Sequence, residues 1–114
     1  MENLIEIVIN RAMRDGSFSK GFDEWLRANW SIYLEFEAQA HKVIKAGRKH
    51  YGAKTIIEYM RHQTMLADAT SEFKINNNVA PDLARLFALR NPVFKDLFEF
   101  RATKRARHVQ AVQS

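Results

Sequence analysis

The residues whose types and spacing are best suited to chemistry lie between positions 73 and 92, in the stretch FKINNNVAPDLARLFALRNP. Three consecutive amides, Asn76, Asn77 and Asn78, stand just before a predicted helix over residues 80–90. An Asn side chain carries both a donor and an acceptor, so it can bind an adenine edge or a phosphate. The run therefore predicts a polar, uncharged surface at the front end of a helix.

Basic side chains occur in three separate groups along the chain. One surrounds the amides, one precedes and begins the helix predicted at 53–66, and one fills the C-terminal segment. The members are Lys74, Arg85 and Arg90; Arg48, Lys49 and Lys54; and Arg101, Lys104, Arg105 and Arg107. Cations from distant segments around an amide patch are typical of a nucleic-acid surface, with phosphates bound by Lys and Arg. We expect DNA as the partner.

Each of these features also has a purely structural interpretation. Asn78 is a good N-cap for the following helix, and Asn76 can form an Asx turn. The C-terminal cations are also compatible with a solvated tail. Trp25 and Trp30 could stack on bases, but their helical spacing favours a place in the core.

Catalysis is poorly supported by the residue pattern. Asp68, Glu72 and Lys74 match the acid-acid-lysine set of metal-dependent nucleases, but a match of three residues is common by chance. The 4 histidines lack ligand spacing, there is no cysteine, and no Gly-rich phosphate loop occurs. We expect a non-enzymatic protein with no catalytic residue, cofactor or metal, and a nuclease is the less favoured alternative.

Composition and charge agree with a basic, compact protein. The 114 residues suit one domain and carry a net charge of +5. Residues 1–41 hold 4 Lys/Arg and 7 Asp/Glu, whereas residues 42–114 hold 14 and 6, so the positive charge is concentrated in the second part. No apolar run of membrane-spanning length and no signal peptide is recognisable, which leads us to expect a cytoplasmic protein without a membrane partner.

The periodicity of apolar residues predicts the elements that position these side chains. Helices are expected over 2–14, 22–28, 31–46, 53–66 and 80–90, with Gly16 and Gly47 ending the first and third. Pro81 suits the first turn of the last helix. Residues 73–75 and 98–101 alternate like short strands. The linker between the last two helices is longer than the 3–4 residues of a tight helix-turn-helix.

These elements predict a mainly α fold, a winged-helix-like helical domain with a short two-stranded β ribbon formed by 73–75 and 98–101. Residues 1–16 form an N-terminal helical arm, residues 17–101 the winged-helix-like domain, and residues 102–114 a flexible basic tail. The apolar face of the arm, Leu4, Ile5, Val8 and Ala12, is suited to docking or to a homodimer contact.

Residues 22–101 resemble small proteins encoded by bacteriophages and prophages, on the motifs GRKHY, IIEYMR, FKINNN, ARLF and FEFR. These proteins are described as winged-helix or helix-turn-helix-like. The resemblance implies that residues 73–78, Arg85 and residues 98–101 are signature positions. It also implies a phage setting, with the protein in the cytoplasm of a host bacterial cell.

Two functions follow as expectations. The first is a DNA-binding protein of the winged-helix class with a regulatory role. The second is an interaction protein that inhibits a host defence system, in the manner of an anti-CRISPR protein, since phage proteins reuse such folds to block host proteins. A basic chain cannot act as an acidic DNA mimic, so such an inhibitor would need an acidic or RNA-bearing host protein as its target.

Overall fold

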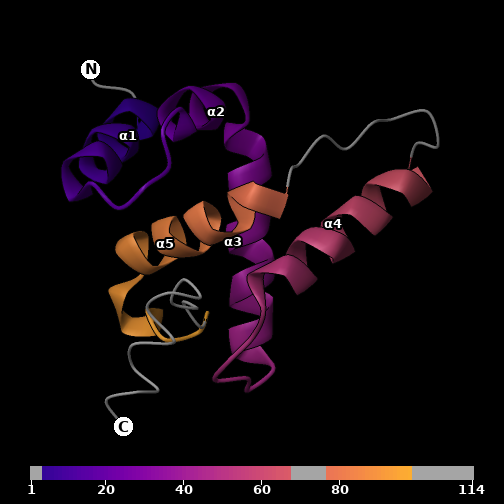
Figure 1. Ribbon diagram of the computed structural model, residues 1–114. Helices are drawn as coiled ribbons and strands as arrows, with labels where there is room; N and C mark the ends of the chain where they lie inside the picture. Colours follow the sequence, from indigo (N-terminus) through magenta and orange to yellow (C-terminus); the bar gives the residue numbers. More distant parts are fainter. Residues whose placement is uncertain (1–3, 68–76, 99–114) are drawn as a thin grey trace, which may run out of the picture.

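The computed structural model describes residues 4–67 and 77–98, and this part of the chain is mainly helical. Its helices are α1 (Leu4–Asp15), α2 (Phe22–Ala28), α3 (Trp30–Lys45), α4 (Ala53–Ala67) and α5 (Ala80–Arg90), with short 3₁₀ turns at η1 (Asn77–Val79) and η2 (Pro92–Phe94). Figure 1 shows α3 running through the middle of the molecule, with α5 crossing it and α4 extending away from its lower end. None of the helices described is both long and apolar enough to cross a membrane.

Glycine and proline set the ends of several helices where the sequence predicts them. Gly16 follows the end of α1 with φ 76°, and Gly47 follows the end of α3 with φ 90°. This left-handed conformation is unfavourable for residues with a Cβ atom, so glycine stops a helix there. Pro81 lies in the first turn of α5. These predicted boundaries are confirmed.

The start of α3 differs from the prediction, which placed Ser31 at its N-cap. Asn29 separates α2 from α3, and its carbonyl accepts hydrogen bonds from the amides of Ile32 at 3.0 Å and Tyr33 at 3.3 Å. The Asn29 side chain donates to the carbonyl of Trp25 at 2.9 Å, which closes the end of α2. Ser31 therefore lies inside α3, because Asn29 already closes its first turn.

The core forms where α3 and α5 face each other. Tyr33 and Phe36 of α3 and Phe87 of α5 are fully buried. The ring of Phe98 lies 5.3 Å from that of Phe36 and 5.4 Å from that of Phe87, measured between centroids. The end of the described chain thus fills the space between the two helices, and burial of these aromatic rings is the main force that holds them together.

Helix α1 belongs to the same buried cluster, and its buried face agrees with the predicted one at Ile5, Val8 and Ala12 but not at Leu4. Val8, Ile9 and Ala12 are buried in the common core, while Leu4 is 55 % exposed. The inward face is therefore centred on Ile9, about one residue further round the helix than the sequence pattern indicated.

The predicted β ribbon is not seen in the described residues. Its first half, residues 73–75, lies outside them, as do residues 99–101 of the second half. Phe98 instead forms a single parallel bridge with Tyr51, whose amide donates to the carbonyl of Leu97 at 2.8 Å. This bond ties the connector between α3 and α4 to the segment that follows α5.

Candidate nucleic-acid interface

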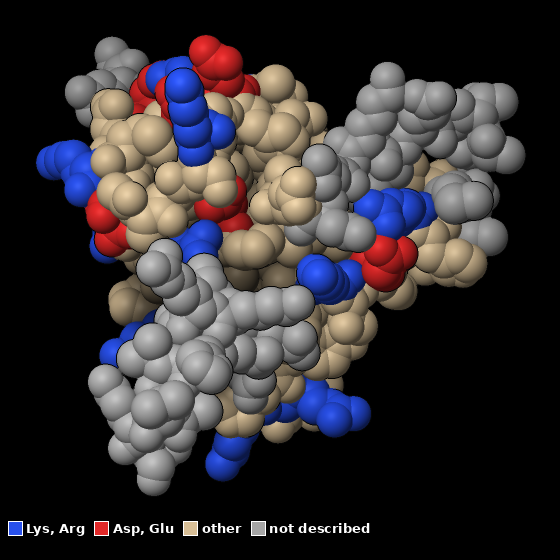
Figure 2. Space-filling model, viewed as in Figure 1, with Lys and Arg blue, Asp and Glu red and all other residues tan. Residues whose placement is uncertain are grey.

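A continuous run of positive charge covers the junction between α3 and α4. Residues 42–54 include no Asp or Glu and carry the cations Lys42, Lys45, Arg48, Lys49 and Lys54. All five side chains belong to exposed residues, and within the described part of the chain no ion pair reaches any of them. Figure 2 shows blue atoms without red ones at the lower end of this face, below the point where α3 ends. We call these five residues the junction cations.

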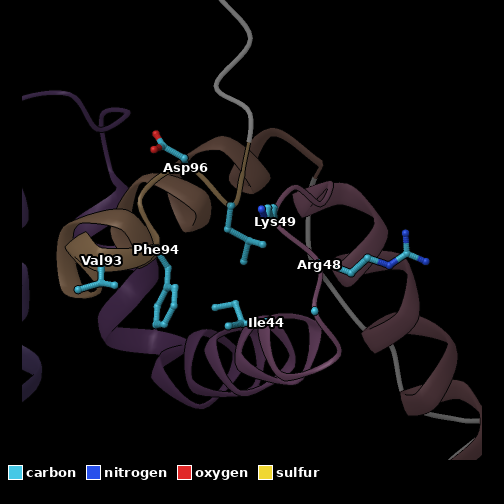
Figure 3. Close-up of a pocket in the computed structure, with 8 residues that line it drawn as sticks. Ile44, Arg48, Lys49, Val93, Phe94 and Asp96 are labelled. Atoms are coloured by element: carbon cyan, nitrogen blue, oxygen red, sulfur yellow. The ribbon is translucent and has the colours of Figure 1, made fainter.

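The turn after α3 spreads these cations around the junction. The amide of Gly47 donates to the carbonyl of Ile44 at 2.9 Å, and that of Arg48 donates to Val43 at 3.3 Å, so the chain reverses within the last turn of the helix. Figure 3 shows Arg48 extending away from the neighbouring hollow, with Lys49 at its rim. The charges therefore face solvent, where they are available to phosphates.

The hollow in Figure 3 is a small cavity of about 320 Å³ beside the junction, with both polar and apolar lining residues. Ile44 of α3 and Phe94 of η2 face each other across it, and Asp96 lies on the rim with its carboxylate pointing outward (Figure 3). Val93 is 86 % exposed next to it. The exposed apolar surface of Val93 and Phe94 is more typical of a protein contact than of a phosphate contact.

A larger cavity of about 640 Å³ lies between the connector, the start of α4 and the start of α5. Lys54, Arg85 and His50 line it, and no acidic residue is among its described lining residues. Figure 2 shows a hollow near the centre of the face, with blue atoms on either side. The structure thus brings two predicted DNA-contacting cations, separated by 30 positions in the sequence, to the same opening. We call this the α4–α5 cavity.

Arg85 is held in place by a buried carboxylate. Asp82, only 2 % exposed, accepts a hydrogen bond from the amide of Ser19 at 3.1 Å and one from Nη1 of Arg85 at 3.3 Å. The carboxylate fixes α5 to the loop before α2 and partly neutralises the guanidinium. Among the described residues, the hydrogen bond to Asp82 engages Nη1, and the Arg85 side chain also lines the cavity.

Arg90, predicted to contact DNA, is partly buried and packs against α3. Its side chain is 23 % exposed, its Nε lies 3.4 Å from Oε2 of Glu37, and its guanidinium carbon lies 5.5 Å from the ring centroids of both Trp30 and Tyr33. Its Nη1 is buried without a hydrogen-bond partner. We therefore assign Arg90 to the packing of α5 on α3 and remove it from the candidate interface.

The carboxylate of Glu37 joins three neighbours into one polar network. Besides Arg90, it accepts a hydrogen bond from the Tyr33 hydroxyl at 2.6 Å and one from Nδ2 of Asn91 at 3.3 Å. Burial, and then the hydrogen bond to Glu37, raises the pKa of the Tyr33 phenol far above its ordinary value. The network stabilises the contact between α3 and the end of α5.

The asparagine run is only partly described. Asn77 and Asn78 lie in η1, directly before α5, and Asn78 is exposed. Val79, not Asn78, occupies the N-cap position of α5, so the capping prediction for Asn78 is wrong. The 3₁₀ turn runs directly into the helix, which moves the cap position one residue along.

Several predicted site residues lie outside the described residues. They are Lys74, Asn76, Arg101, Lys104, Arg105 and Arg107, together with Asp68 and Glu72 of the nuclease alternative. Within the described ranges, no group of three or more His, Asp or Glu side chains is arranged to hold a metal ion.

Two other expectations can be compared with the structure. Trp25 and Trp30 pack against the core, with their rings 5.8 Å from Phe22 and 5.5 Å from Tyr33 respectively, which agrees with the structural interpretation. Lys42 and Lys45 were missed as candidate residues. The signal that would have found them is the acid-free run that continues from α3 into the connector.

Comparisons with known proteins do not extend this description: a scan against protein-family models, a search of curated proteins and a search of solved structures each found no match. The functional conclusion therefore depends on the geometry of the junction and the α4–α5 cavity.

Proposed function

We propose that the protein is a non-enzymatic DNA-binding protein whose contact surface is the α3–α4 junction together with the α4–α5 cavity. The main observation behind the proposal is that Lys54, one of the junction cations, and Arg85 of α5 line the same cavity, while Arg48 and Lys49 line the neighbouring hollow. The two segments are distant in sequence. Among the described residues that line the two cavities, Asp96 is the only acidic one. Such a surface suits the regularly spaced phosphates of a duplex.

The finer expectations from the sequence belong to the same proposal. A winged-helix arrangement would complete the helices with a ribbon from residues 73–75 and 98–101, and the remaining predicted cations would extend the surface. The exposed Asn78 at the start of α5 supports a contact there, because a helix start with polar side chains suits a groove or a phosphate. The phage setting, a regulatory role and a cytoplasmic location are part of this proposal.

The test compares two triple variants of equal charge. Arg48→Gln/Lys49→Gln/Lys54→Gln removes three cations of the proposed surface, whereas Arg11→Gln/Arg14→Gln/Lys20→Gln removes three from the region of α1 and the loop after it. We expect the first variant to lose most of its affinity for a random duplex in a fluorescence anisotropy titration at low salt, and the second to keep it. Equal losses would show only a dependence on net charge and would contradict the proposed surface.

One observation favours a second candidate, the binding of a host protein as an inhibitor. Val93 and Phe94 expose apolar surface beside the small cavity of Figure 3, next to Arg48 and Lys49. Pull-down from host lysate with and without nuclease treatment separates the two functions. An inhibitor retains its partner after nuclease treatment and loses it in the Val93→Ser/Phe94→Ser variant, whereas a DNA-binding protein loses lysate partners after nuclease treatment.

A further inference from the structure

We propose that the α4–α5 cavity binds a single nucleotide, with the phosphate on its cationic side and the base against its apolar side. The inference rests on the proposed function, because it assigns a ligand class to one part of the same surface. It goes further in one respect: a duplex presents its phosphates on an outer surface, whereas a cavity admits an unpaired nucleotide.

The size and lining of the cavity define the ligand. Its volume of about 640 Å³ lies within the range of roughly 300–1,000 Å³ that is typical of small-molecule sites. Its described lining combines the cations Lys54 and Arg85 and the imidazole of His50 with the apolar residues Ala80, Ala84 and Phe98. A ligand that fits both must join an anionic group to a flat apolar body, and a nucleotide is the common molecule of that kind.

The polar groups that line the cavity come from three elements, so their grouping is a property of the fold and not of one helix. His50 belongs to the connector, Lys54 to the first turn of α4 and Arg85 to the middle of α5. The imidazole Nδ1 of His50 lies 3.2 Å from the carbonyl oxygen of Asp96, which holds the ring at the cavity edge. Asp82 anchors Arg85 by accepting a hydrogen bond from its Nη1.

Neighbouring carboxylates leave the charge of Lys54 uncompensated. Glu58 is four residues away on the same helix, but it forms an ion pair with Arg61. No described acidic side chain lines the cavity, and the described residues contain no ion pair to Lys54. The start of α4 adds the positive end of a helix dipole to this side of the cavity.

The aromatic contact is provided by Tyr51. This residue is partly buried and lines the cavity, and its backbone is positioned by the hydrogen bond from its amide to the carbonyl of Leu97. A tyrosine ring at the cavity wall can stack on a base, and stacking of this kind is tolerant of base identity.

The test uses Thr55, an exposed residue that lines the cavity near the start of α4. Thr55→Glu places a negative charge where the phosphate would bind, and an acidic residue in the first turn of a helix does not disturb folding. Thr55→Gln is the matched uncharged control. The probes are adenosine monophosphate, adenosine, and a short single strand with or without a 5′ phosphate, followed by NMR amide shifts and by anisotropy.

We expect adenosine monophosphate to shift the amides of residues 50–55 and 80–85 but not those of Arg11 and Lys20, and adenosine to bind more weakly. Thr55→Glu should weaken nucleotide binding by about tenfold, because the new carboxylate repels the phosphate, while Thr55→Gln should retain it. Tighter binding of the phosphorylated strand than of the mononucleotide identifies a nucleotide unit of a strand as the ligand. The reverse order identifies a free nucleotide.

Shifts spread over all Lys and Arg regions, or equal affinity in the Glu and Gln variants, would overturn the nucleotide site. Duplex binding is measured in parallel with the same proteins. If the duplex binds and the nucleotide does not, the cavity inference fails and the proposed function stands. If the nucleotide binds and the duplex does not, the site stands and duplex binding fails.

Discussion

The ion pair between Glu37 and Arg90 allows a test of whether Arg90 stabilises the fold or contacts DNA. Replacing Glu37 by Gln keeps the shape of the side chain and removes its charge. The Arg90 guanidinium, which already has one buried nitrogen without a hydrogen-bond partner, then loses its ion-pair partner. The Tyr33 hydroxyl and the Asn91 amide keep an oxygen acceptor but lose a charged one.

The size of the effect follows from these contacts. Hydrogen bonds to charged groups contribute about 2 kcal/mol, and the partial exposure of Arg90 allows water to replace part of what is lost. We therefore expect the free energy of unfolding to fall by about 2 kcal/mol in Glu37→Gln. For a chain of this length, that corresponds to a decrease in Tm of about 8 °C. The control is Glu35→Gln, since Glu35 is exposed and bonds only Gln39 on the same helix.

The assay is thermal and urea unfolding followed by circular dichroism, with duplex affinity measured on the same samples. Arg90→Met keeps the apolar contact with the Trp30 and Tyr33 rings, so the double variant with Glu37→Gln should lose less stability than the sum of the single variants. Additive losses would refute the coupling. An Arg90→Met protein with unchanged Tm and weakened DNA binding would refute the assignment of Arg90 to the core.

Three further outcomes are expected. If Arg48, Lys49 and Lys54 all bind phosphates, the slope of log affinity for a duplex against log salt concentration should be shallower by about 2.7 in their triple variant than in the original chain. An unchanged slope would contradict those contacts. Because folding raises the pKa of Tyr33, its contribution to the free energy of unfolding should be fully present below a pH of about 10 and decrease as the pH rises further. Urea midpoints should show a smaller decrease in the Tyr33→Phe variant. Gly47→Ala should lower the free energy of unfolding by about 1–2 kcal/mol because φ is 90°, although an added Cβ would meet open space. An unchanged urea midpoint would contradict this strain.

The helix ends were predictable wherever one residue type determines the backbone conformation. Gly16 and Gly47 adopt positive φ, and Pro81 lies in a first turn, so each marks a boundary by local chemistry alone. The start of α3 was not predicted, because both Asn29 and Ser31 are capable caps and only the hydrogen bonds to the Asn29 carbonyl decide between them. Boundaries with two adjacent candidates are not determined by composition.

The interior position of Arg90 carried a sequence signal that charge obscured. Arg90 is seven residues after Leu83, in the same stripe as Leu86 and Phe87, so the helical period places it on the buried face. Glu37 likewise follows the buried Tyr33 by four residues. Two opposite charges, each within an apolar stripe, are a pattern that favours a buried pair over two surface sites.

The α4–α5 cavity could not be predicted from the pattern of residues. It depends on how the starts of two helices meet, and the sequence places Lys54 and Arg85 in different segments. The three basic groups named Lys54 and Arg85, which line one cavity, but periodicity did not show that these two residues would meet. Their convergence is a property of tertiary packing, for which periodicity contains no information.

The hydrogen bonds of Tyr51 to Leu97 and of His50 to Asp96 connect the proposed binding surface to the segment that follows α5. The connector after α3, which carries Arg48 and Lys49, is held by hydrogen bonds to the backbone of Asp96 and Leu97. A ligand that binds this connector should therefore oppose unfolding of the segment after α5. It should raise the Tm of the whole protein and not only order the connector. Conversely, a chain truncated before Leu97 would keep the same charges on a less ordered connector, and its affinity for a duplex should be lower.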